Sequence, residues 1–83
     1  MTLQATVQKA ALFLDHEFPG WAHGITRPVR MDSPVDCVLG QIIGEKKTWV
    51  DIALEFHRRT GEIRPFTSIG ATPFWQTEIE QRL

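Results

Sequence analysis

The sequence predicts a mostly helical protein, a small bundle of three to four short helices that also allows a short extended segment. Apolar residues recur at helical spacing in several segments, and turn-forming Pro and Gly residues separate these segments. The hydrophobic content of 42% is ordinary for a globular domain. Because 83 residues suffice for one core only, we expect residues 1–83 to form a single small helical domain.

The first helix is expected from about Leu3 to Phe18. Thr2 is a suitable N-cap, and Pro19-Gly20 provides the stop. Residues 19–32 then form a connection with turn signals, in which the residue before Pro28 is biased towards an extended conformation. The apolar residues expected to hold this connection on the core are Trp21, Ile25, Val29 and Met31.

A second helix is expected over residues 33–44, at the centre of the bundle. Ser33 is read as its N-cap, Pro34 as its first residue and Asp36 as an acid in its first turn. One face would carry the uncharged residues Cys37, Gly40 and Gln41, with Gly44 just beyond, and its small residues would let another segment pack closely. The opposite face would be apolar and buried, formed by Val35, Val38, Leu39, Ile42 and Ile43.

Two more helices complete the predicted bundle. One should start at the cap Thr48, run to about Thr60 and end at Gly61, with an outward i, i+4 pair between Glu55 and Arg59. Residues 62–71 are interpreted as a loop or short extended stretch. Thr72-Pro73 then begins the last helix, whose buried side would be Trp75, Ile79 and Leu83.

One segment resembles a known group of proteins. Residues 11–44 contain Phe13-Leu14-Asp15, Pro19-Gly20-Trp21, Met31 and the run Cys37-Val38-Leu39-Gly40-Gln41, followed by Gly44. These elements resemble uncharacterised small proteins of actinobacteria and their phages that share a CVLGQ-type segment. The resemblance covers about half of the chain and implies a shared fold and a phage or prophage setting. It implies no activity and does not extend to residues 45–83.

Composition narrows the function classes. The formal net charge is −1, which argues against a general nucleic-acid binder because such affinity comes mainly from clustered cations. The single cysteine, the absence of a signal-peptide pattern and the absence of a bilayer-length apolar stretch indicate a cytoplasmic protein without a membrane partner. The oligomeric state does not follow from the sequence.

No catalytic or metal constellation is predicted. Cys37 is interpreted as a small packing residue, with a reactive or ligand cysteine as the alternative. His16, His23 and His57 lack the short paired spacings typical of zinc sites, so no metal and no cofactor are expected. We therefore expect a protein that is not an enzyme, and an enzyme with Cys37 as nucleophile is the least favoured hypothesis.

The leading functional hypothesis is a protein-binding or accessory module, phage- or prophage-encoded, with an unidentified protein partner. The alternative is a small nucleic-acid-binding regulator that uses the Lys/Arg surface between Lys46 and Arg64. Of the three tryptophans, Trp49 and Trp75 are expected inside, whereas Trp21 fits either a core or a surface anchor. The candidate partner-binding residues are therefore Trp21, Lys46, Lys47, Arg58, Arg59 and Arg64.

Overall fold

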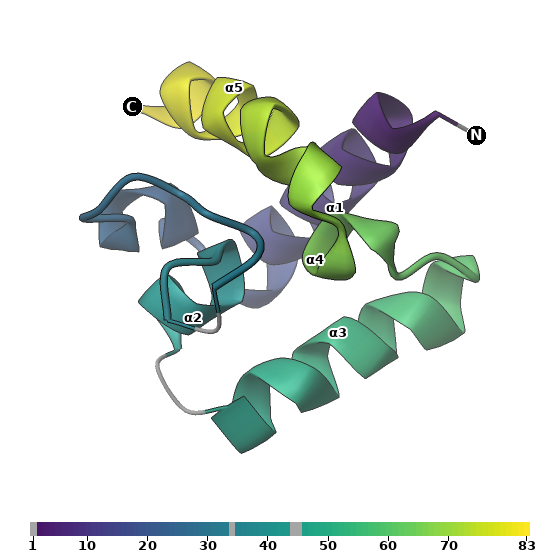
Figure 1. Ribbon diagram of the computed structural model, residues 1–83. Helices are drawn as coiled ribbons and strands as arrows, with labels where there is room; N and C mark the ends of the chain where they lie inside the picture. The colour runs from purple at the N-terminus through teal and green to yellow at the C-terminus, as the bar shows by residue number, and fades with distance from the viewer. Residues whose placement is uncertain (1, 34, 44–45) are drawn as a thin grey trace.

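The computed structural model describes residues 2–33, 35–43 and 46–83, with the backbone alone at residues 46 and 47. In these residues the secondary structure is helical and contains no β-strand, which confirms the predicted mostly helical fold (Figure 1). The elements in chain order are α1 (Leu3–Glu17), the 3₁₀ turn η1 (Trp21–Gly24), α2 (Val38–Ile42), α3 (Lys46–Thr60), α4 (Arg64–Thr67), the 3₁₀ turn η2 (Ile69–Ala71) and α5 (Thr72–Arg82).

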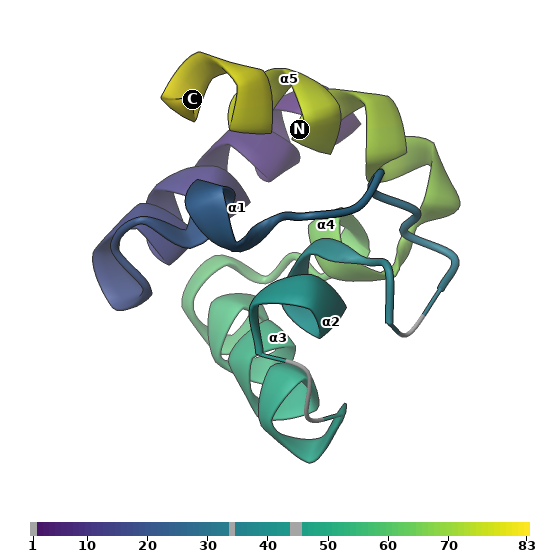
Figure 2. The ribbon, with the colours of Figure 1, turned by 90° about the vertical axis from the view of Figure 1, so that its left-hand side faces the viewer.

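The helices form two groups with a connecting segment between them. Figure 2 shows α1 and α5 on one side and α2 and α3 on the other, and the segment after η1 runs between the two groups. The backbone N–H of Met31 donates to the hydroxyl of Thr72 at 3.2 Å, which fixes this segment to the start of α5. None of the described helices is both long and apolar enough to cross a bilayer.

A chain of aromatic contacts joins the helices through the core. Phe13 of α1 contacts Phe56 of α3, which contacts Phe66 of α4, with ring centroids 5.4 and 5.3 Å apart. Phe66 contacts Trp75 of α5, and Trp75 contacts Trp21 of η1, both at 5.6 Å. Three of these four contacts are edge-to-face, which is a favoured arrangement of aromatic rings. One core therefore connects five elements of the chain.

The first helix agrees with its prediction. Thr2 caps α1, and its hydroxyl accepts the backbone N–H of Ala5 at 3.1 Å. The helix ends at Glu17, and Gly20 adopts a left-handed conformation with φ 81° that turns the chain into η1. Local signals were sufficient here because the cap, the apolar stripe and the stop lie within the segment itself.

The predicted start of the second helix is wrong, because α2 begins at Val38 with Cys37 as its N-cap. The Ser33 hydroxyl caps a separate turn instead, accepting the backbone N–H of Asp36 at 3.2 Å. The carbonyl of Asp36 accepts the backbone N–H of Arg30 at 3.1 Å and so is directed out of the helical pattern. Val35 is consequently 60% exposed rather than buried, whereas Pro34 and Gly44 lie outside the described residues.

The small face of this segment is buried as expected. Cys37 and Gly40 both lie inside, and Val38 and Leu39 beside them are almost fully covered. The packing interpretation is confirmed for these four residues, whereas Gln41, Ile42 and Ile43 are only partly buried and Val35 is exposed.

The second half of the chain requires three corrections. The helix α3 starts at Lys46, two residues before the expected cap Thr48, although it ends at Thr60 and at Gly61 with φ 74° as predicted. Residues 62–71 form α4 and η2 rather than a loop or extended stretch. Leu83 is 71% exposed, because α5 buries Trp75 and Ile79 but ends before Leu83 reaches the core.

Candidate functional site

The structure buries Trp21, which the sequence left open as a surface anchor. Trp21 is 3% exposed, and its indole N–H donates to Asp15 Oδ1 at 2.9 Å. The guanidinium of Arg82 lies over the indole ring, 5.5 Å from the ring centroid. Trp21 is thus largely covered by the end of α5, and it borders a small depression of about 180 Å³ beside His23 and Arg82.

Asp15, Arg82 and Glu78 form the ion-pair network that holds this cover in place. Arg82 binds Asp15 through two contacts of 2.8 and 2.7 Å and Glu78 at 3.1 Å. The hydrogen bond from Arg82, reinforced by that from Trp21 and opposed by burial, lowers the pKa of Asp15. The same pair with Asp15 raises the pKa of Arg82. The network is structural, because it ties the last turn of α5 to the last turn of α1.

Within the described part of the predicted Lys/Arg surface, each arginine pairs with a carboxylate. Arg58 pairs with Glu55, and Arg59 bridges Glu55 at 3.0 Å and Glu17 at 3.2 Å. Arg64 pairs with Glu62 at 2.6 Å. Every other arginine of the chain also contacts a carboxylate. The side chains of Lys46 and Lys47, the remaining candidates, lie outside the described residues.

A hollow with a tryptophan in its wall lies between α3, α4 and the segment that precedes α2. Its volume is about 290 Å³, close to the lower limit for pockets that bind small ligands. Apolar side chains dominate the described part of its lining, which also contains one carboxylate, two hydroxyls and one thiol. We call it the Trp49 hollow; its lining residues are Met31, Asp32, Ser33, Cys37, Trp49, Phe66 and Thr67.

Trp49 differs from the other two tryptophans. The indole N–H of Trp75 donates to the carbonyl of Pro65 at 2.6 Å, and that of Trp21 donates to Asp15. For the indole N–H of Trp49, no acceptor is present among the described residues. Trp49 is also only half-buried, so the expectation that it lies inside holds for part of its ring.

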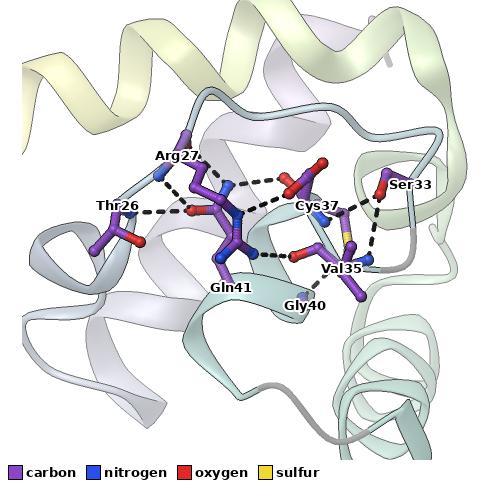
Figure 3. A network of polar contacts seen from close by, with 8 residues as sticks. Thr26, Arg27, Ser33, Val35, Cys37, Gly40 and Gln41 are labelled. Atoms are coloured by element: carbon purple, nitrogen blue, oxygen red, sulfur yellow. Dashed lines mark hydrogen bonds and ion pairs between the residues drawn. The ribbon is translucent and has the colours of Figure 1, made fainter.

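A polar bracket centred on Gln41 holds the segment that forms one wall of the hollow (Figure 3). Gln41 Oε1 accepts the backbone N–H groups of Thr26 and Arg27 at 3.0 and 2.9 Å. Gln41 Nε2 donates to the carbonyls of Arg27 and Asp36 at 3.0 and 2.9 Å. The side-chain amide thereby uses both of its N–H donors, and its oxygen accepts twice. The bracket joins residues 26–27 to residue 36, on either side of the wall.

Arg27 adds a second connection across the same segment. Its Nε donates to Asp36 Oδ1 at 2.8 Å, and its Nη2 donates to the carbonyl of Val35 at 2.7 Å (Figure 3). The ion pair is exposed and adds little energy by itself. Its main effect is to orient the turn of residues 33–36, which carries Ser33 at the edge of the hollow.

Cys37 is one of the lining residues of the hollow. Its side chain is 5% exposed, and its sulfur accepts the backbone N–H of Gly40 at 3.2 Å. The three histidines, His16, His23 and His57, are exposed and do not line the hollow. Among the described residues no group of three His, Cys, Asp or Glu side chains could hold a metal ion.

Two other depressions have larger volumes but less specific chemistry. One, of about 370 Å³, lies beside Pro28, Ile79 and Glu80, and the other, of about 430 Å³, lies over Leu54 and Arg58 on the outer face of α3. Among the described lining residues, neither contains a tryptophan or a phenylalanine. The Trp49 hollow is therefore the candidate site.

The sequence pattern predicts Trp49 as a core residue and Ser33 as a helix cap, so neither is predicted to bind a partner. It does not indicate Asp32 or Thr67 as site residues. The available signal was that Trp49 lies in the first turn of α3, where fewer neighbouring elements cover the side chains. No protein-family model, no curated protein and no solved structure matches this chain.

Proposed function

We propose that this protein is a non-enzymatic binding or accessory module, phage- or prophage-encoded, that holds a protein partner at the Trp49 hollow. The observation that carries the proposal is the state of Trp49: half-buried, beside an apolar hollow, with an indole N–H that the described residues leave without an acceptor. Tryptophan is enriched among the residues that dominate binding energy at protein interfaces. Its ring contributes apolar contact area, and its N–H group can form a directional hydrogen bond with the partner.

The arginine pairs favour this function over nucleic-acid binding. A phosphate-binding surface needs cations that are available to the phosphates. Arg58, Arg59 and Arg64 are each held by a carboxylate of this chain. A nucleic acid would have to compete with Glu55 and Glu62 for these cations, at a small cost for each exposed pair.

The hollow also supports binding better than catalysis. Catalysis by Cys37 would need a neighbouring base and an accessible sulfur. The thiol is almost fully covered, and among the described lining residues Asp32 is the one carboxylate and none is a histidine. The lining thus contains an apolar anchor with a few polar groups, which is typical of a recognition site.

The proposal can be tested by blocking the hollow without disturbing the core. Thr67 is exposed at the edge, and we expect Thr67→Trp to fill the hollow while leaving the free energy of unfolding within about 0.5 kcal/mol. The matched control is Leu12→Ala on α1, which changes an exposed leucine that does not line the hollow. Immobilised protein would be incubated with lysate of an actinobacterial host, and retained proteins identified by mass spectrometry.

The expected result is a protein retained by the unmodified chain and by Leu12→Ala but lost with Thr67→Trp and with Trp49→Ala. Circular dichroism would show whether each variant is folded. If saturating bait retains nothing, or if the same proteins bind to Thr67→Trp, the hollow is not the partner site. Retention of nucleic acid that falls steeply with salt concentration would support the alternative instead.

A further inference from the structure

We infer that the partner segment presents one apolar side chain to the Trp49 hollow, a backbone carbonyl to the indole N–H and a cationic side chain to Asp32. This inference rests on the proposed function and specifies the chemistry of the partner. Its three parts follow from the volume, the unused donor and the charge of the same site.

The volume limits what enters the hollow. About 290 Å³ accommodates a single large side chain, and Met31, Trp49 and Phe66 make the surroundings apolar. A helix that docks through a whole face needs a groove long enough for anchors at i, i+3 or i+4 and i+7. The occupant is therefore one aliphatic or aromatic side chain from a short segment.

The Trp49 indole fixes the orientation of that segment. Burial of this N–H under a partner without an acceptor would cost about 1–3 kcal/mol. The peptide backbone next to the inserted side chain supplies a carbonyl that can accept this hydrogen bond. The hydroxyls of Ser33 and Thr67 lie in the same lining, and Thr67 already donates to the carbonyl of Ile63 at 3.1 Å. The Ser33 hydroxyl accepts the backbone N–H groups of Val35 and Asp36, so the indole N–H and the Ser33 O–H are the two side-chain donors of the lining without an acceptor among the described residues.

The charge of the lining determines which residue of the partner segment is favoured next to its apolar side chain. Asp32 is the one charged residue among the described residues of the lining. Its contact with Arg30 is long, at 3.4 Å from a single nitrogen, and Arg30 is 66% exposed, so the carboxylate retains capacity to accept. A lysine or arginine of the partner would share this carboxylate, whereas an acidic residue there would be repelled.

Three blocked tetrapeptides provide the test: acetyl-Gly-Leu-Arg-Gly-amide, its Glu counterpart acetyl-Gly-Leu-Glu-Gly-amide, and acetyl-Gly-Gly-Arg-Gly-amide. Each is titrated into ¹⁵N-labelled protein, and the three indole N–H signals are followed by NMR. Trp21 and Trp75 are internal controls because their N–H groups are bonded within the chain. We expect the Leu-Arg peptide to shift the Trp49 signal selectively at millimolar concentration.

The Leu-Glu peptide should bind about fivefold more weakly, because attraction to Asp32 is replaced by repulsion across an exposed pair. In Asp32→Asn this preference should fall below twofold. In Trp49→Phe, followed by the backbone amide of Thr67, affinity should fall about three- to tenfold because one hydrogen bond is lost while a ring is retained. The peptide without leucine should leave the Trp49 signal unchanged.

The outcomes separate the inference from the proposed function. Equal binding of the Leu-Arg and Leu-Glu peptides would overturn the cationic part and leave the hollow as a binding site. An unchanged affinity in Trp49→Phe would overturn the role of the indole donor. If none of the peptides shifts the Trp49 signal, the hollow does not accept an apolar side chain, and the proposed function loses its site.

Discussion

Replacing Gln41 with alanine should destabilise the fold by about 2.5 kcal/mol. The change removes four hydrogen bonds of 2.9–3.0 Å that no neighbouring side chain replaces. A hydrogen bond contributes about 0.5–1.5 kcal/mol net, and three of these are exposed, so water offsets part of their loss. The fourth, to the partly buried carbonyl of Asp36, takes a value nearer the middle of that range.

The measurement is urea unfolding followed by tryptophan fluorescence, together with thermal unfolding followed by circular dichroism. For a domain of this size, 2.5 kcal/mol corresponds to a decrease in Tm of roughly 10–20 °C. Gln81→Ala is the matched control, since Gln81 is an exposed glutamine of α5, and its free energy of unfolding should change by less than about 0.5 kcal/mol. If the two variants lose the same small amount, the bracket does not hold the wall of the hollow.

Three further predictions concern other parts of the chain. Arg82→Gln should cost about 2–3 kcal/mol at pH 7, because Glu78 is buried and loses its cation. Arg82 also lowers the pKa of Asp15, so the stability from their ion pair is present above the pKa of Asp15 in the unfolded chain and disappears as the pH falls through its native pKa. The cost of Arg82→Gln measured by urea unfolding should therefore be smaller at pH 2.5 than at pH 7. An equal cost at the two pH values contradicts the assignment. Gly61→Ala should lower stability by about 1 kcal/mol in thermal unfolding, from backbone strain alone, because φ is 74° and nothing lies within 4 Å of an added Cβ. Iodoacetamide should alkylate Cys37 slowly in the native protein and rapidly in urea, and fast native labelling would revive the enzyme hypothesis.

The sequence was most informative where the determining contacts are local. The boundaries of α1, the end of α3 at Gly61 and the start of α5 at Thr72 follow from caps, glycine and proline within a few residues. The start of α2 was missed because Gln41 and Arg30 withdraw the carbonyl of Asp36 from the helix. Those partners depend on how the connection folds back, which periodicity does not reveal.

The candidate site was the least predictable part. Trp49 occupies the same face of α3 as Ala53 and Phe56, and that pattern correctly indicates an inward direction. How far it is covered depends on the ends of two other segments, at Met31 and Phe66, which approach it only in the folded protein. Helical spacing therefore predicts the orientation of the tryptophan but not the hollow beside it.

The contact between Asp15 and Arg82 joins residues 67 positions apart. During synthesis, Trp21 leaves the ribosome long before the helix that shields it. Until α5 arrives, a large indole and the apolar side of α1 stay open to water and to other chains. The nascent protein should therefore be prone to association, and the closure of its core should coincide with the emergence of residue 82.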